Sequence, residues 1–410
     1  MRLRGLLLLL TGLLVTSPLA AAPKVHVVEK GHSLWSIAKR YGVTVKAIEA
    51  QNGLRSGAAI RPGQRLEIPE PGQKASPKKS DAKAEPSKSK ADSGKAGSEK
   101  AESKVDWVNA KPDASTQTQK SAKDRGVNPC NTPDPGQGIY TRWDRAPSLG
   151  QMIMPERGGV TANGGFDVMF HFHGHEPVRK EWVKVMNGAV LVGVDLGIGS
   201  GPYESTFRSP DAFRRLMASV EKRVAERTGK KRVYIRKMGL SAWSAGYGAV
   251  ESILRHPEFK QKVDAVVLLD GLHSANTEPM KSKQLEPFVE FARLAARRQR
   301  FMFVSHSSII PPGYASTTET ANFLIHALGG KPKAERPRGA DPMGLERIAS
   351  YSRGNFHVRG YRGNDKMDHC AHIGLFKDVL KVHVSRRWSS PRGYGPKAPS
   401  REPAQVTASR

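Results

Sequence analysis

The chain has 410 residues, and its 66 Lys and Arg against 38 Asp and Glu give a formal net charge of +28. At about 100–200 residues per domain, this length predicts two or three folding units. The charge excludes an acidic tail protein and indicates anionic surroundings, and the presence of only two cysteines excludes a disulfide-rich miniprotein and a multi-cysteine zinc scaffold.

Residues 1–22 have the three parts of a secretory signal peptide. Two arginines among the first four residues precede the apolar run Gly5–Val15, and small residues follow at Ser17–Ala22. The apolar run is shorter than the roughly 20 residues that a membrane span needs. We therefore expect cleavage near Ala21 or Ala22 and an exported, periplasmic or extracellular protein without stable membrane insertion. An uncleaved anchor is the alternative.

Residues 25–69 predict a compact module with the order strand, helix, helix, strand. Val25–Val28 is strand-like, apolar residues recur at helical spacing from Leu34, Val45–Gln51 indicates a second helix, and Arg65–Pro69 closes the module as a strand. The stretch VVEKGHSLWSIAKRYGVTVKAIEAQNGL, followed by IRPGQRLEIP, resembles the LysM family.

The LysM resemblance implies binding of peptidoglycan or another glycan that contains N-acetylglucosamine. In that family the groove lies between the loop after the first strand and the loop before the last, which gives the glycan-binding candidates Gly31, His32, Ser33, Leu34, Ile60, Arg61, Pro62 and Gly63. The family often has Asp where this chain has His32, so the preference among glycans stays open. The alternative is a module that only spaces or stabilises.

The rest of the chain divides by composition. Residues 70–137 are rich in Lys, Ala, Ser and Pro and bury too little apolar surface to fold, so they predict a disordered linker. Between residues 138 and 388, apolar runs of strand length alternate with helical patterns, which predicts a mostly parallel sheet with helices on both faces, an α/β fold. Residues 389–410 predict a flexible basic tail.

The sharpest chemical motif is Ala-Trp-Ser-Ala-Gly at residues 242–246. A strand candidate precedes it and a helical pattern follows it, so Ser244 stands at the apex of a strand–turn–helix unit. Such an elbow holds the serine in a strained backbone conformation and requires small neighbours. Gly246 fits this requirement, and Ala242 replaces the usual glycine. A structural serine that starts a helix is the alternative.

Residues 138–388 resemble the α/β-hydrolase fold, because further strand candidates surround this elbow in the right order. In that family the catalytic triad follows the order Ser, acid, His. The resemblance makes Ser244 the nucleophile and His369 the base, with His372 as the alternative base. Asp270, at the end of an apolar run, is the favoured acid, and the alternatives are Glu319, Asp365 and Asp368.

The same resemblance implies an oxyanion hole made of backbone N–H groups. One donor is expected from Ala245, after the nucleophile, and the other from Gly174, with His175 as its alternative, after the strand that ends at Phe172. The alternating histidines of this segment would need further ligands to hold zinc, and no carboxylate–histidine cluster is evident. We therefore expect no metal and no cofactor.

Cys130 and Cys370 are the only cysteines, and the oxidising environment of an exported protein favours a disulfide between them. Together these features predict an exported serine hydrolase, an esterase or amidase, that the LysM module holds at peptidoglycan or a related glycan and that acts through an acyl-serine intermediate. One alternative is a catalytically inactive envelope-binding protein with a hydrolase-like scaffold. Nucleic-acid binding is disfavoured, because basic and aromatic residues do not interleave.

Two loops rich in Gly, Pro and Ser, at residues 199–202 and 307–318, are expected to lie on the same rim as the elbow and to shape its pocket.

Overall fold

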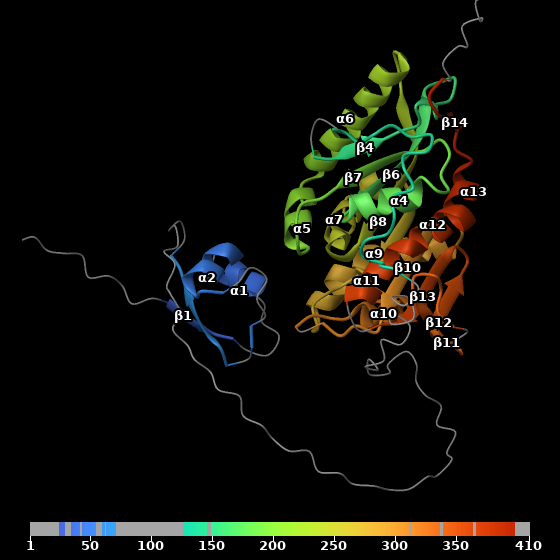
Figure 1. The fold of residues 1–410 in the computed structure, drawn as a ribbon. Coiled ribbons are helices and arrows are strands. Elements are labelled where there is room, and N and C mark those ends of the chain that lie inside the picture. Colours follow the sequence, from blue (N-terminus) through green and yellow to red (C-terminus); the bar gives the residue numbers. More distant parts are fainter. Residues whose placement is uncertain are drawn as a thin grey trace, which may run out of the picture. The chain divides into compact units, whose positions relative to one another are not determined.

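The computed structural model describes residues 24–28, 34–41, 43–54, 60–61, 63–70, 126–145, 149–311, 313–336, 339–363 and 366–397. The chain divides into two compact units, within residues 1–97 and 98–410 (Figure 1). The predicted signal peptide, residues 71–125 of the predicted linker and residues 398–410 of the predicted tail lie outside the described residues.

The small unit has the predicted order of elements. Strand β1 (Lys24–Val27) pairs antiparallel with β2 (Arg65–Ile68), and helices α1 (Leu34–Tyr41) and α2 (Val45–Gln51) lie between them in the chain. Thr44 caps α2, because its side chain accepts a hydrogen bond from the Ala47 N–H at 3.1 Å. The buried apolar side chains form a small core: Val28, Leu34, Ile37, Ala38, Ile48, Leu66 and Ile68.

The large unit is built on a ten-stranded sheet with the order β11-β12-β13-β10-β9-β8-β6-β7-β4-β3. The strands from β7 to β13 in this order pair parallel, and the strands outside them pair antiparallel. The strand bounds are β3 Asp144–Arg145, β4 Gln151–Ile153, β6 Gly165–Phe172, β7 Val190–Val194, β8 Tyr234–Trp243, β9 Val263–Leu269, β10 Phe301–Ser307, β11 Lys333–Ala334, β12 Glu346–Arg353 and β13 Phe356–Arg362.

Helices cover both faces of this sheet (Figure 1), and each face has its own apolar core. One face carries α5 Gly201–Phe207, α6 Pro210–Thr228, α7 Tyr247–Leu254, α9 Met280–Ala296 and α10 Thr317–Ala327, with the short α8 Pro257–Lys260 beside them. The other carries α4 His175–Trp182, α11 Lys366–Ala371, α12 Leu375–Val379 and α13 Ser385–Trp388. Because both faces are covered, every residue of β9 and β10 is buried.

The strand order identifies the fold. Among the parallel strands, only β6 and β7 exchange places relative to chain order, and the sheet then continues through β8, β9, β10 and β13 with helices between them; beyond β13, the antiparallel β12 and β11 follow in reversed chain order. A tight turn, η1 (Ser244–Gly246), joins β8 to α7. This is the α/β-hydrolase arrangement, preceded in the chain by a LysM-type module, as the sequence predicts. The antiparallel strand β12 was not predicted.

The large unit extends beyond its predicted boundaries, residues 138 and 388, at both ends. Residues 126–137, predicted as linker, are fixed to it: Cys130 forms a disulfide with Cys370, and buried Arg179 bonds Asp134 and the Gly136 carbonyl. In the predicted tail, β14 (Gly393–Tyr394) pairs with β5 (Arg157–Gly158). Amino-acid composition did not indicate that these two segments belong to the large unit, because a disulfide and contacts with residues distant in the chain fix them to it. No helix in the described ranges has the length and apolar character of a membrane span.

Candidate active site

Ser244 occupies a sharp turn at the carboxyl end of β8. Its φ is 51°, a left-handed conformation that a residue with a side chain seldom adopts. The backbone packs too tightly here for larger neighbours. A Cβ atom on Gly246 would lie 2.0 Å from the Phe172 carbonyl oxygen, and one on Gly271 would lie 2.4 Å from the Ser244 carbonyl oxygen. The small residues therefore permit the elbow that the motif predicts.

Three neighbouring strands end in the same unusual conformation. His173, Ser244 and Asp270 follow β6, β8 and β9, and their φ values are 69°, 51° and 44°. These strands are adjacent and parallel, so their carboxyl ends meet at one edge of the sheet. Backbone strain concentrates at functional sites, and in open α/β sheets this edge is the ordinary place for one.

Asp270 holds His369 by a direct hydrogen bond. Nδ1 of His369 lies 2.8 Å from Oδ2 of Asp270, and the other carboxylate oxygen accepts from the Ser307 N–H and the Thr317 hydroxyl, each at 2.8 Å. Asp270 is 1% exposed. The carboxylate is therefore saturated with donors and orients the imidazole with Nδ1 toward it, which leaves Nε2 as the free nitrogen.

The charge of Asp270 is kept in spite of its burial. Burial acts to raise the pKa of this carboxyl, but nearby His372 and the hydrogen bonds from His369 and Thr317 outweigh it and hold the pKa well below its usual range. An ionised acid that bonds an imidazole stabilises the protonated form of that imidazole, which is the role of the acid in a serine triad.

Ser244, Asp270 and His369 line one cavity of about 370 Å³. The remaining lining residues are His273, Ser307, Ile309, Pro311, Tyr314, Thr317 and Lys366. The loop predicted at residues 307–318 thus forms one wall. The loop predicted at residues 199–202 contributes no lining residue; Ser200 instead accepts a hydrogen bond from Tyr247 and donates one to Glu204.

The structure gives the positions of the alternative candidates for the base and the acid. His372 is fully buried, bonds the Ser305 hydroxyl at 2.9 Å and does not line the cavity. Glu319 closes a capping box with Ser316 at the start of α10. Asp368 is buried outside the cavity lining, and Asp365 lies outside the described residues.

Sequence reasoning missed Trp243, the residue before the nucleophile. Its ring stacks on His369 at 4.8 Å between centroids and on His173 at 5.3 Å, and its Nε1–H donates to the His369 carbonyl at 3.0 Å. Trp243 therefore packs against the face of the His369 imidazole, while Asp270 bonds its Nδ1. The sequence signal for Trp243 was its position in the elbow motif. A motif on one segment does not show that His173 and His369, from other segments, pack against this ring.

The predicted oxyanion donors need a correction. The Gly174 N–H donates to Oδ1 of Asp195 at 2.7 Å, and the His175 N–H lies 3.5 Å from the other oxygen. Asp195 thus accepts the hydrogen bond of the Gly174 N–H, and the same carboxylate also pairs with His175 Nδ1. Neither Ala245, the residue after Ser244, nor Gly174 lines the cavity.

The alternating histidines have separate partners. His171 bonds Ser241 and the His173 carbonyl, His173 bonds the Tyr203 hydroxyl, and His175 pairs with Asp195. Burial, the largest influence, lowers the pKa of His171 to about 3. Within the described part of the chain, no three His, Cys, Asp or Glu side chains come together as a metal site.

The glycan-binding candidates of the small unit are only partly described. Gly31, His32, Ser33 and Pro62 lie outside the described residues. The Leu34 side chain is 8% exposed and belongs to the core, so any contact with a ligand falls to its backbone. Ile60 packs against the same core, whereas Arg61 and Gly63 are exposed.

Comparison with known proteins supports the assignment of the small unit. The LysM domain family matches residues 26–69. The chain is 49% identical over 57 residues to the probable autolysin SsaALP of Staphylococcus aureus, a match that covers 14% of this chain and 21% of that protein. It is 42% identical over 50 residues to SpoIVD-associated factor A of Bacillus subtilis, covering 12% and 13%. The chain thus spans about a fifth or less of these relatives.

Solved structures resemble the large unit at low identity. An acylaminoacyl peptidase from Pyrococcus horikoshii matches at 12% identity and a TM-score of 0.35, covering 64% of this chain and 43% of its own. A feruloyl esterase module from Clostridium thermocellum matches at 12% and 0.37, covering 61% and 89%. Est1E from Butyrivibrio proteoclasticus matches at 10% and 0.31, covering 60% and 98%. The fold assignment given above rests on the strand order itself.

Proposed function

We propose that this protein is an exported serine hydrolase that cleaves an ester or amide bond and is held at a glycan containing N-acetylglucosamine by its LysM module. One observation carries the proposal. A buried, ionised Asp270 orients His369 at 2.8 Å in a cavity that Ser244 also lines, and Ser244 stands on a strained elbow. A base with an orienting acid, next to a hydroxyl on an elbow, is the arrangement that activates a serine.

The chemistry proceeds in two stages. Nε2 of His369 takes the proton of the Ser244 hydroxyl while Oγ attacks the carbonyl carbon of the substrate, and Asp270 stabilises the imidazolium. His369 then gives the proton to the departing alcohol or amine, which leaves an acyl-serine. Water, deprotonated by the same imidazole, attacks the acyl carbon, and Ser244 regains its proton.

The walls of the cavity favour a substrate with an apolar acyl group. Ile309, Pro311 and Tyr314 come from the loop after β10 and line the same cavity as Ser244. Lys366 stands one helical turn before His369 on α11 and adds a cation to the rim. Both features suit a substituent that joins an apolar body to an anionic group, such as an acyl decoration of a wall polymer.

The LysM module raises the local concentration of that substrate. A covalent connection between the two units converts encounter with the polymer into an effectively intramolecular event, without any new catalytic contact. The net charge of +28 adds attraction to an anionic envelope.

The test is labelling of the full chain with a fluorophosphonate probe, followed by identification of the modified residue. Modification of Ser244, lost in Ser244→Ala and strongly reduced in His369→Ala, supports the proposal. Deletion of residues 24–70 should leave labelling unchanged and remove sedimentation with peptidoglycan.

Absence of labelling in the folded protein would favour the second candidate, an inactive envelope-binding scaffold. The observation in favour of that candidate is the Asp195 carboxylate on the Gly174 amide, because an occupied amide cannot stabilise an oxyanion. An Asp195→Asn variant that gains labelling would show that this contact restrains an otherwise competent site.

A further inference from the structure

A second cavity lies at the opposite edge of the sheet from Ser244. It has a volume of about 460 Å³ and is lined by the amino-terminal parts of β8 and β9, by the residue before β10, and by α6. The lining residues are Met217, Glu221, Tyr234, Ile235, Arg236, Lys237, Met238, Gln261, Lys262, Asp264 and Arg300. Strand β8 runs from this cavity to the elbow, and its ten residues span about 30 Å. The two cavities are therefore separate sites on the large unit, with no lining residue in common.

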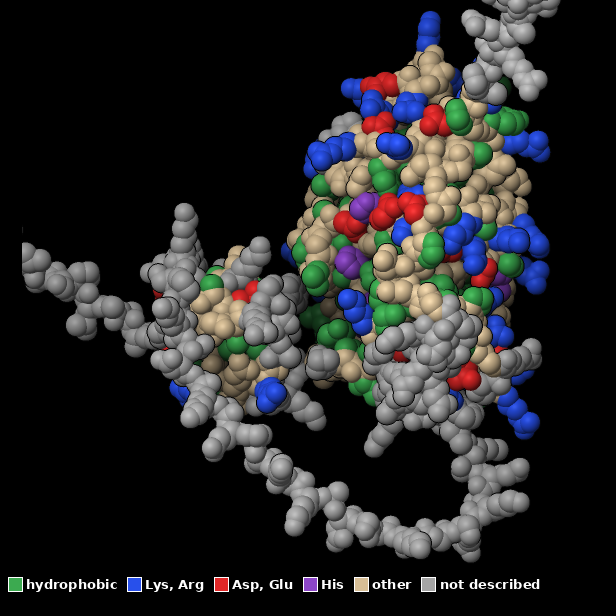
Figure 2. Space-filling view, viewed as in Figure 1, with side chains coloured by type: hydrophobic (Ala, Val, Ile, Leu, Met, Phe, Trp, Pro, Cys, Tyr) green, Lys and Arg blue, Asp and Glu red, His purple; other side chains and the backbone are tan. Residues whose placement is uncertain are grey.

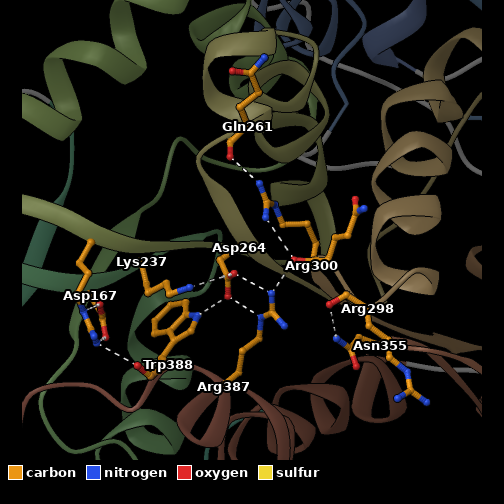
Figure 3. Close-up of polar contacts among 11 residues, drawn as sticks. Asp167, Lys237, Gln261, Asp264, Arg298, Arg300, Asn355, Arg387 and Trp388 are labelled. Atoms are coloured by element: carbon orange, nitrogen blue, oxygen red, sulfur yellow. Dashed lines mark hydrogen bonds and ion pairs between the residues drawn. The ribbon is translucent and has the colours of Figure 1, made fainter.

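Positive charge prevails in this cavity. Arg236, Lys237, Lys262 and Arg300 line it, against the carboxylates Glu221 and Asp264. Arg236 is compensated by the buried Asp167, whose two oxygens accept from its guanidinium at 2.8 and 2.5 Å, so the excess charge comes from Lys237, Lys262 and Arg300. Asp264 is already neutralised, as Figure 3 shows: Arg387 donates to both of its oxygens at 2.7 and 2.9 Å, and the Trp388 indole N–H donates at 2.9 Å. Lys237 approaches the same carboxylate only to 3.6 Å.

Arg300 carries a charge that the fold does not compensate. Its guanidinium donates to the carbonyl oxygens of Gln261 at 2.8 Å and Gln299 at 3.3 Å, and its Nε is buried without a hydrogen-bond partner (Figure 3). Lys262 is exposed beside it. Across the described ranges, no carboxylate forms an ion pair with Arg300 or Lys262. Carbonyl oxygens satisfy donors but leave a full positive charge, so the cavity is prepared for an anion.

The rest of the lining suits a ring attached to that anion. Tyr234 is 44% exposed, and Met217 and Ile235 add apolar surface beside it. The apolar face of a sugar can pack on an aromatic ring while its charged substituent reaches the cations. The volume lies in the ordinary range of small-ligand sites and holds one or two sugar rings.

We propose that this cavity binds a sugar that carries a phosphate or carboxylate group, as a unit of an acidic glycan. It would be a second attachment point on the large unit, independent of the nucleophile. Figure 2 shows Lys and Arg side chains spread over much of the visible surface of this unit, which would keep a polyanion near it.

The test is titration calorimetry on the full chain at low ionic strength, with glucose 6-phosphate, glucuronate, inorganic phosphate and glucose as separate probes. We expect glucose 6-phosphate or glucuronate to bind, glucose not to bind, and inorganic phosphate to bind more weakly than the better acidic sugar. The preference between the first two identifies the anionic group. Lys262→Glu and Arg300→Gln should each weaken that binding at least tenfold, and Arg300→Lys should restore part of it.

Lys333→Glu is the matched control, because it makes the same charge change at an exposed residue of β11 outside the cavity. It should alter binding less than twofold, and Ser244→Ala should leave it unchanged. The proposal fails if neither acidic sugar binds, if inorganic phosphate binds as tightly as both, or if Lys333→Glu weakens binding as much as Lys262→Glu. Since Lys262 is exposed, its variant tests the proposal even if Arg300→Gln does not fold.

Discussion

The two units of this protein build their candidate sites in opposite ways. In the small unit, the candidate loops adjoin short elements within about 45 residues, and seven buried apolar side chains among its described residues form a core. In the large unit, Ser244 and Asp270 follow the adjacent parallel strands β8 and β9, and His369 lies on α11, far along the chain. These residues come together only through the packing of the fold. A local sequence motif is therefore enough to identify the candidate glycan site of the small unit, whereas identifying the candidate active site of the large unit also requires the topology of the sheet.

The largest effect on this comparison should come from removing Asp270, the acid that the sequence favours among several and that the structure places against His369. Asp270→Asn should reduce kcat for p-nitrophenyl esters about 10⁴-fold, because the imidazole loses the charge that orients it and stabilises its protonated form. Steady-state kinetics measures the effect, and peptidoglycan sedimentation should not change.

A double variant adds the control. Because residues of a triad act as a unit, Asp270→Asn combined with Ser244→Ala should lose no more activity than Ser244→Ala alone. A loss of less than tenfold in Asp270→Asn would contradict the assignment of the acid.

Acid should destabilise the large unit through its buried histidines. Burial, foremost, lowers the pKa of His306 and of His372 to about 4, whereas an unfolded histidine titrates near 6.5. Between these values the unfolded chain binds more protons than the folded one, so stability falls as pH drops from about 6.5 to 4, by up to about 3 kcal/mol for each histidine. The depressed pKa of Asp270 acts in the same direction below about pH 4.

Calorimetric unfolding at several pH values measures this effect. His306→Gln should flatten the pH dependence of the free energy of unfolding by about one proton. A melting temperature of the large unit that stays constant between pH 6.5 and 4.5 would contradict the expectation.

The close packing of the elbow predicts a smaller effect. Gly271→Ala should cost about 2–3 kcal/mol and at least tenfold in turnover, because its Cβ would lie 2.4 Å from the Ser244 carbonyl oxygen and push the nucleophile aside. Gly229→Ala is the control: its φ of 65° makes alanine strained, but no atom lies within 4 Å of the added Cβ. It should cost about 1 kcal/mol and leave turnover intact. Equal effects of the two variants on turnover would refute this account.

The smallest expected effect is on the stability of the small unit alone. Thr44→Ala removes the side-chain cap of α2 and should cost about 1 kcal/mol. Differential scanning calorimetry should show a lower transition for the LysM module and an unchanged one for the large unit, with the same esterase activity. A shift of both transitions would mean that the units do not unfold independently.

Local patterns in the sequence were sufficient for much of the architecture. Helical spacing from Leu34 and the strand at Arg65 predicted the small unit, because its core forms between neighbours in the chain. Small residues around Ser244 predicted the elbow, since steric limits on a tight turn are local. The disulfide between Cys130 and Cys370 was also expected, because no other thiol exists in the chain.

Other features required the tertiary structure. Trp243 packs between His173 and His369, and Asp195 takes the Gly174 amide, because side chains from separate strands meet at the sheet edge. The antiparallel strand β12 has a mixed pattern of buried and half-exposed residues, which gives no clear period.

The sequence by itself determined the turn at Ser244, the LysM module and the succession of strand candidates along the chain, because steric limits and apolar periodicity act over a few neighbouring residues. Only the tertiary structure decided that Asp270 bonds His369 while His372 is buried and does not line the cavity. The reason is physical: two histidines three residues apart differ little in local pattern, and the direction of their rings is set by strands and helices packed from distant parts of the chain.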